Sequence, residues 1–145
     1  MVDKLTKKDI NEINKLGQIL NPNFEKLFHI NDLNPNEFIY VYKENDTVLG
    51  FIHIHINYEV VELLNIVVKE EYQNKHIATL LMDYMITALP KTCERIILEV
   101  ESTNLKAIKL YNKFNFLKIG ERKKYYGDND AIIMERSLIW KMYIY

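Results

Sequence analysis

Residues 63–82 have the sequence LLNIVVKEEYQNKHIATLLM, in which a polar loop joins an apolar run to an amphipathic segment. A strand is predicted over residues 60–68, because a nearly continuous apolar run is typical of a strand covered on both faces. A helix is predicted over residues 77–89, where apolar residues recur at helical spacing, and Pro90 ends it. The next strand is predicted over residues 95–101.

Outward from this stretch, the apolar spacing predicts helices at residues 8–20, 24–30 and 104–114. Strands are predicted at 38–43, 52–56, 116–126 and 131–138, so that a meander of three antiparallel strands opens the sheet. The predicted class is α+β: a mixed, twisted sheet with helices on both faces, in three αβα layers. The length fits a single domain over residues 1–145.

The composition excludes several classes of function. The formal net charge is −1, so no basic excess drives nucleic-acid binding, and no apolar run is long enough to span a membrane. Cys93 is the only cysteine and is expected to be an inert thiol in a loop; a cytoplasmic location fits this. The abundance of Ile, Asn, Lys and Tyr suggests a bacterial source.

Histidines and isoleucines alternate between residues 52 and 56, which is typical of a half-buried strand. His53 and His55 are therefore expected to be partly exposed on one face. No third ligand is evident, so no metal site is predicted.

One carboxylate stands out from its surroundings. Glu99 interrupts an apolar strand and precedes Tyr111, on the following helix, by twelve residues. An amine must lose a proton before it attacks and a leaving group must gain one, so an acid–base pair is one interpretation. The alternatives are a solvated Glu99 paired with a lysine, and a Tyr111 ring that only fills the core.

Four segments together resemble the GNAT superfamily of acyl-CoA-dependent N-acetyltransferases, and are most similar to the bacterial ribosomal-protein alanine N-acetyltransferases. They are LLNIVV at 63–68, YQNKHIATLLM at 72–82, LEVESTNLKAIKLYNKFNF at 98–116 and RKKYYGDNDAIIM at 122–134. The resemblance implies the GNAT fold, with acetyl-CoA as co-substrate, Glu99 as base and Tyr111 as acid.

The resemblance also implies a set of cofactor-binding residues. The backbone of the strand would hold the thioester, the loop before the helix would hold the pyrophosphate at a helix N-terminus, and an asparagine would contact the cofactor. These residues are Ile66, Val67, Val68, Gln73, Asn74, Lys75, His76, Ile77, Ala78, Thr79 and Asn104. His76 replaces a glycine of the family pattern, although histidine is enriched among residues with positive φ. Asn104 is also a good helix N-cap, and Asn115, which replaces another family glycine, tolerates the left-handed conformation that ends a helix.

The resemblance implies that Tyr125 or Tyr126 contacts a peptide acceptor; otherwise they are exposed aromatics at a strand end. The expected partners are acetyl-CoA and a protein or peptide N-terminus, with the chain as a monomer or weak homodimer. The alternatives are a small amine or polyamine acceptor and a non-catalytic acyl-CoA-binding module.

The segment Asn21-Pro22-Asn23-Phe24 lacks the family's Pro-Trp. The only tryptophan, Trp140, lies in an apolar tail that packs on the sheet or joins a partner.

Overall fold

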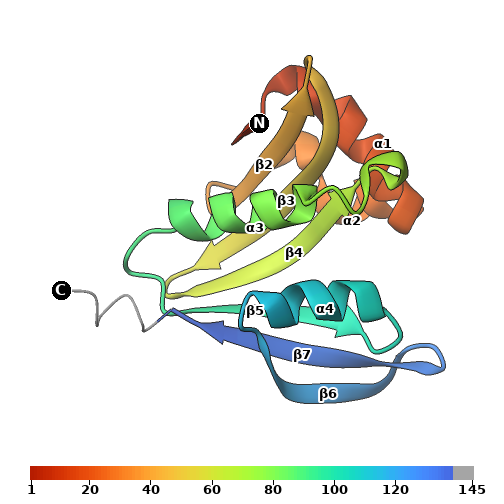
Figure 1. Cartoon of the computed structure of the whole chain (residues 1–145), viewed down its shortest axis with the longest axis vertical. Coiled ribbons are helices and arrows are strands. Elements are labelled where there is room, and N and C mark those ends of the chain that lie inside the picture. Colours follow the sequence, from red (N-terminus) through yellow and green to blue (C-terminus); the bar gives the residue numbers. More distant parts are fainter. Residues whose placement is uncertain (139–145) are drawn as a thin grey trace. The chain divides into compact units, whose positions relative to one another are not determined.

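A computed structural model describes residues 1–138 (Figure 1). Its internal contacts divide the chain into two compact units. The first unit is Met1–His55 with Leu64–Leu89, and the second is Ile56–Leu63 with the chain from Pro90 onward. The single domain over residues 1–145 stays a prediction, and the tail at 139–145 lies outside the described residues. In the described part of the chain, no helix is long and apolar enough to cross a membrane.

The described residues form a mixed sheet of seven strands in the order β1-β2-β3-β4-β5-β7-β6. β4 and β5 are parallel, whereas the pairs β1–β2, β2–β3, β5–β7 and β6–β7 are antiparallel. The strands are β1 (Val2–Lys4), β2 (Glu37–Glu44), β3 (Thr47–Asn57), β4 (Val60–Val68), β5 (Arg95–Glu101), β6 (Leu117–Tyr126) and β7 (Asn129–Ser137). The helices are α1 (Ile10–Leu20), α2 (Phe24–Phe28), α3 (Ile77–Ala88) and α4 (Leu105–Lys113), with 3-10 turns at Lys7–Asp9, Ile30–Asp32 and Glu70–Tyr72.

In the first unit, helices cover both faces of the sheet (Figure 1). α1 and α2 bury Ile13, Leu16 and Phe24 in one core with residues of β2, β3 and β4 that include Val41. α3 covers the opposite face, where the Tyr84 ring lies 5.0 Å from the ring of Tyr40, the strand neighbour of Val41. Because strand side chains alternate between faces, these contacts define three layers, as predicted.

Gly50 on β3 permits a close approach between strand and helix layers in this unit. A Cβ added at Gly50 would meet the carbonyl oxygen of Val67 at 2.8 Å and the side chain of Ile77 at 3.4 Å. The contact with a backbone atom cannot be relieved by a rotamer change. Gly50 therefore helps to fix the end of β4 and the start of α3, the two segments that the sequence assigns to the cofactor.

In the second unit, β5 lies between β4 and β7. The Tyr111 ring packs against Phe116 with centroids 5.7 Å apart, and Asn115 between them has φ 66°, the left-handed conformation expected from the sequence. The β6–β7 hairpin turns at Gly127, whose φ is also 66°. Cys93 lies in a loop, as predicted, and its thiol is buried.

Several sequence expectations differ from the structure. β3 begins at Thr47 rather than near Ile52, and α2 ends at Phe28 rather than near Ile30, because His29 adopts the left-handed conformation. β1 was not predicted, because three residues are too few for a period; its hydrogen bonds to β2, in the register Asp3↔Val41, hold it in the sheet. The expected partial exposure of His53 was wrong, since its exposed fraction is 0%. β2 and β4 supply polar partners for the His53 ring, and the Phe28 ring from α2 lies edge-on to it at 5.7 Å. Because these contacts come from other elements, the alternation along β3 could not predict that His53 is buried. His55 is half-buried, as predicted.

Candidate active site

The predicted thioester-binding residues lie at the end of β4. β4 pairs with β5 over three residue pairs, from Val60↔Arg95 to Glu62↔Ile97, and then runs on to Val68. The Val67 side chain is buried, while those of Ile66 and Val68 are half-buried. The role of this backbone in holding a thioester stays a prediction.

The predicted pyrophosphate loop leads into the N-terminus of α3. Asn74 and His76 both have positive φ, 63° and 64°, and His76 is the N-cap residue of the helix. The Gln73 side chain donates to the carbonyl oxygen of Val68 at 3.1 Å, which ties the loop to β4. The residues from Gln73 to His76 are exposed. An exposed turn with left-handed residues before a twelve-residue helix is suited to an anion, because the first N–H groups of any helix lack partners within the helix.

The left-handed conformation at His76 leads to a prediction. Glycine adopts this conformation without the cost of roughly 1–2 kcal/mol that a Cβ imposes. We expect His76→Gly to bind coenzyme A as tightly as the wild type, or more tightly, when both are titrated calorimetrically at pH 5.5 and pH 8. Weaker binding of the variant at pH 5.5 alone would instead indicate an imidazolium–phosphate contact, because histidine is charged mainly below neutrality. No binding by either protein at either pH would contradict a cofactor role for the loop.

Glu99 lies on β5 in an ion pair that the sequence did not reveal. Its Oε1 lies 3.1 Å from Nε of Arg122, with the side chains of Glu99 and Arg122 28% and 55% exposed. The guanidinium also lies 5.4 Å above the Tyr125 ring. Oε2 of Glu99 has no hydrogen-bond partner within residues 1–138. The carboxylate is therefore anchored at one oxygen and free to accept a proton at the other.

Tyr126 interacts electrostatically with this carboxylate, and it also interacts with Tyr111 and Tyr125. Tyr111 is 7% exposed, and burial, with a smaller contribution from Tyr126, raises its pKa to about 12. Burial also raises the pKa of Tyr126, followed by the charge of Glu99. The rings of Tyr125 and Tyr126 meet at 5.3 Å and 90°, and both remain partly exposed. The second unit thus gathers Glu99, Tyr111, Tyr125 and Tyr126.

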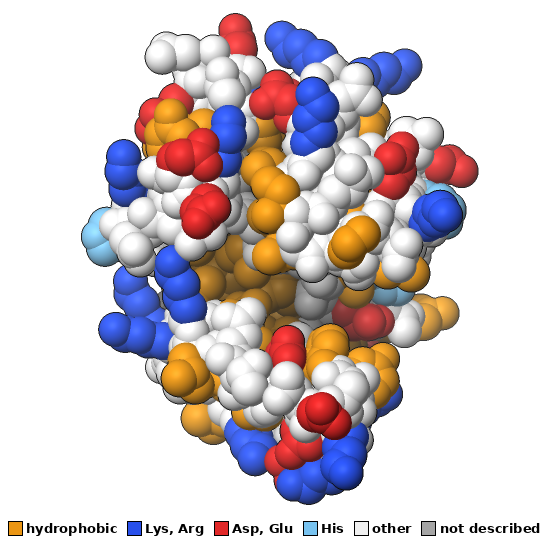
Figure 2. Space-filling view, turned by 90° about the vertical axis from the view of Figure 1, so that its right-hand side faces the viewer, with side chains coloured by type: hydrophobic (Ala, Val, Ile, Leu, Met, Phe, Trp, Pro, Cys, Tyr) orange, Lys and Arg blue, Asp and Glu red, His pale blue; other side chains and the backbone are white. Residues whose placement is uncertain are grey.

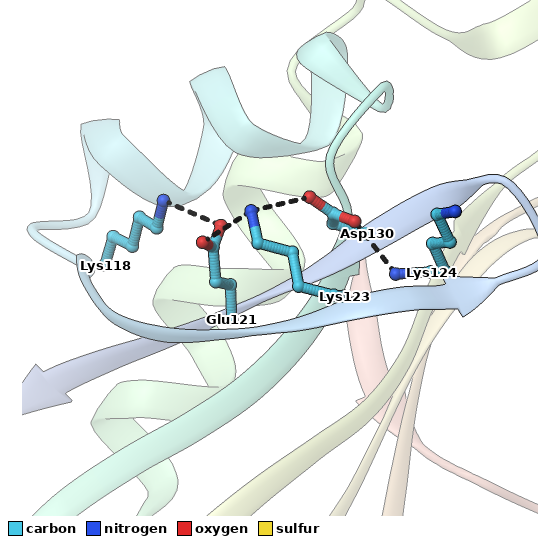
Figure 3. Close-up of polar contacts among 5 residues, drawn as sticks. All are labelled: Lys118, Glu121, Lys123, Lys124 and Asp130. Atoms are coloured by element: carbon cyan, nitrogen blue, oxygen red, sulfur yellow. Dashed lines mark hydrogen bonds and ion pairs between the residues drawn. The ribbon is translucent and has the colours of Figure 1, made fainter.

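A β-bulge in β6 positions the two adjacent tyrosines. The register shifts between Arg122 and Tyr126, and Lys124 has φ 51°. Asp130 accepts from the Lys124 backbone N–H at 2.8 Å, and this bond is the first cause of its lowered pKa. Lys123 bridges Asp130 to Glu121, which also accepts from Lys118 (Figure 3). Each exposed pair contributes little, but the backbone contact holds the bulge in shape.

Asn104 caps α4, as predicted: its Oδ1 accepts from the Ala107 backbone N–H at 3.2 Å. Its contact with the cofactor stays a prediction. Within residues 1–138, no three His, Cys, Asp or Glu side chains are grouped to hold a metal ion. On the face in Figure 2, acidic and basic side chains are interspersed, rather than forming the continuous basic surface that binds nucleic acid.

Arg122 is the residue of this cluster that sequence reasoning missed. β7 separates β6 from β5, with Arg122 opposite Ala131 and Ala131 opposite Glu101. The arginine therefore reaches Glu99 across an intervening strand. No spacing rule along the chain predicts such a contact before the strand order is known.

The chain belongs to the Acetyltransferase (GNAT) family, which it matches over residues 9–116. It is an acyl-CoA-dependent N-acetyltransferase with acetyl-CoA as co-substrate. It is 31% identical, over 90% of its length and 88% of the relative's, to an N-alpha-acetyltransferase of Saccharolobus solfataricus. It is 34% identical, over 70% of its length and 69% of the relative's, to a putative [ribosomal protein bS18]-alanine N-acetyltransferase of Bacillus subtilis.

The fold is also similar to that of a solved structure. The ribosomal-protein-S18-alanine N-acetyltransferase of Escherichia coli superposes with a TM-score of 0.86 at 26% identity, covering 95% of this chain and 93% of that one. The GNAT fold predicted from the sequence is thus confirmed. Because the chain matches an archaeal relative as well as bacterial ones, the bacterial source stays a prediction.

Proposed function

We propose that this chain acetylates the N-terminal α-amine of a protein, with Glu99 as the base and Tyr111 as the acid, in the cytoplasm. The observation that carries the proposal is that Glu99 and Tyr111 both interact electrostatically with the Tyr126 hydroxyl. The base and the acid are thus near one partly exposed tyrosine. Relatives named for N-alpha and ribosomal-protein alanine acetylation support the choice of acceptor.

The reaction is a direct transfer. Glu99 takes a proton from the ammonium, the amine nitrogen attacks the thioester carbon, and the C–S bond then breaks. The departing sulfur gains a proton from Tyr111, and Tyr111 recovers a proton from the nitrogen, which loses its second proton as the amide forms. The backbone of Ile66, Val67 and Val68 would polarise the thioester carbonyl, and a donor placed there stabilises the developing oxyanion. An α-amine, with a pKa of about 7.7–8.0, needs far less help from a base than a lysine near 10.4.

Tyr111 acts as a hydrogen-bond donor before it acts as an acid. Transfer of its proton to a thiolate of ordinary pKa, about 8.5, would be uphill by about 5 kcal/mol because the pKa of Tyr111 is raised to about 12. A hydroxyl that stays protonated at neutral pH can stabilise the leaving sulfur throughout C–S cleavage. The proton then moves as the thiolate, also removed from water, becomes more basic.

Exposed apolar side chains in the first unit favour a peptide over a small polar amine. Ile19, Leu20 and Leu27, at the end of α1 and on α2, are 58–73% exposed. Exposed apolar side chains suit contact with another chain. Phe24, from the segment that replaces the family's Pro-Trp, is 1% exposed and belongs to the core.

The acceptor class can be tested by measuring coenzyme A thiol release from acetyl-CoA. The panel contains peptides with free N-termini, the same peptides with blocked N-termini and an internal lysine, and polyamines. We expect kcat/KM to be highest for free peptide N-termini. Faster turnover with a polyamine or with the blocked peptides would contradict the proposed acceptor and favour the small-amine or lysine alternative.

A further inference from the structure

Three side chains of the first unit form a hydrogen-bond chain that the proposed reaction does not use. Oε1 of Glu37, on β2, lies 3.2 Å from Nε2 of His53, on β3. Nδ1 of the same ring lies 3.2 Å from Nδ2 of Asn65, on β4. His53 is fully buried, and Asn65 is half-buried.

Chemistry fixes the protons in this chain. A carboxylate only accepts, so Nε2 of His53 must carry the hydrogen that meets Glu37. In the neutral ring Nδ1 is then bare and accepts, so Asn65 must present its NH₂ group rather than its oxygen. The orientation of the Asn65 amide is thus set by Glu37 through the imidazole.

This orientation leaves the Asn65 oxygen available. Within residues 1–138, Oδ1 of Asn65 has no hydrogen-bond partner. Because the NH₂ group of the same amide is held by His53, this half-buried carbonyl oxygen is positioned to accept a hydrogen bond from an N–H donor. An amine or the first peptide N–H of an acceptor is such a donor.

The position of Asn65 matches that use. Its partner His53 contacts Phe28 of α2, so the amide lies on the face that α1 and α2 cover. The predicted cofactor loop leads into α3, which covers the other face. Ile66, one strand residue or roughly 3.3 Å further on, begins the backbone proposed to hold the thioester. An amine that attacks from the face opposite the cofactor would meet Asn65.

We propose that the Asn65 amide oxygen binds the N–H of the amine acceptor, and that Glu37 and His53 are positioning residues that hold it in that orientation. This inference rests on the proposed function, in that it assigns an acceptor-binding group to the same reaction. It does not depend on whether the acceptor is a peptide or a small amine, because both donate N–H bonds.

The hydrogen-bond chain from Glu37 through His53 to Asn65 also couples acceptor binding to pH. Burial lowers the pKa of His53; the Glu37 carboxylate opposes this, and His55 on the same strand adds to the lowering. α2 presents the Phe28 ring, and β4 presents the neutral amide of Asn65. When His53 gains a proton, Nδ1 becomes a donor, so Asn65 must turn its oxygen inward and its NH₂ outward. Acceptor binding is then lost at acidic pH.

The first test replaces Asn65 with leucine, which has the same branching at Cγ and no polar atoms. With acetyl-CoA and the best free-N-terminal peptide of the panel at pH 7.5, we expect Asn65→Leu to raise the peptide KM about tenfold or more. The calorimetric Kd for coenzyme A stays unchanged. An unchanged peptide KM, or an equal rise in the Kd for coenzyme A, overturns the inference.

A double-mutant cycle separates positioning from packing. His53→Leu frees the amide to rotate, so it raises the peptide KM, whereas adding it to Asn65→Leu raises KM no further. Independent, multiplicative effects would show that His53 acts only through packing and would overturn its positioning role. Thermal unfolding of each variant identifies any that fails to fold; His53→Gln, which keeps a polar side chain, then replaces His53→Leu in the cycle.

The pH profile supplies a readout that packing does not move. In the wild type, we expect the peptide KM to rise as the pH falls below the ordinary histidine pKa of about 6.5. The peptide KM of Asn65→Leu, measured in parallel, should lack this rise. Glu37→Gln keeps an acceptor for Nε2–H but removes the charge that favours the imidazolium, so the rise moves to lower pH. His55→Gln removes a competing positive charge, so the rise moves slightly higher. A wild-type profile parallel to that of Asn65→Leu overturns the coupling.

Failure of the proposed function is distinguishable from failure of this inference. If the wild type acetylates a polyamine and no peptide, the proposed acceptor is wrong, and the same KM comparison is made with the polyamine. If it acetylates peptides and Asn65→Leu does so with an unchanged KM, the proposed function stands and the inference is overturned.

Discussion

Glu99→Gln is expected to lower turnover by about 10²–10⁴-fold while leaving coenzyme A binding intact. Glutamine keeps the size of the side chain, but it cannot take a proton from the ammonium. The effect therefore falls on the chemical step. Steady-state thiol release between pH 6 and 9, with calorimetric binding of coenzyme A, measures both quantities.

Two variants separate this role from the ion pair. Arg122→Gln breaks the bond to Glu99 without removing the carboxylate, and Glu101→Gln removes the carboxylate two residues along β5, whose Oε1 accepts from Asn129 at 2.7 Å. We expect turnover to stay within about tenfold for the first and about twofold for the second, since a largely exposed ion pair contributes about 0.2–1 kcal/mol. Near-wild-type turnover of Glu99→Gln at every pH would show that Glu99 is not the base and serves only as the ion-pair partner of Arg122.

Tyr111→Phe is expected to lower turnover by about 10²-fold with little loss of stability at neutral pH. The ring keeps its contact with Phe116, and only the hydroxyl is removed. Burst and single-turnover measurements should place the loss in C–S cleavage rather than in cofactor binding. A lower melting temperature with unchanged turnover per folded molecule would instead make Tyr111 a packing residue.

The raised pKa of Tyr111 gives this variant a second signature. Burial raises that pKa from 10 to about 12, so the stabilising contribution of the neutral hydroxyl is full below pH 10 and is lost as pH rises through 12. The wild type should lose up to about 3 kcal/mol of unfolding free energy in that range that Tyr111→Phe does not lose. Denaturant unfolding of both proteins at pH 8 and 11 measures the difference, about half of which, ~1.4 kcal/mol, should have developed by pH 11.

The local elements could be predicted from the sequence, because hydrophobic period and punctuation are properties of the chain itself. β4 and β5 have the predicted bounds, α3 begins at Ile77 and ends one residue before its predicted end, and Asn104 caps α4. His76 and Asn115 adopt the left-handed conformations expected at replaced glycines. The family pattern was also readable, because its four segments keep their order and spacing.

The surroundings of the site residues could not be read in this way, because they depend on which strands become neighbours. The ion pair of Glu99 with Arg122 requires β7 to lie between β5 and β6. The burial of His53 requires partners from β2 and β4 and a ring from α2, although its own strand alternates as if one face were open. Local sequence thus determined which side chains are candidates for the chemistry, whereas long-range pairing and packing decided which charge, hydroxyl or amide each of them meets.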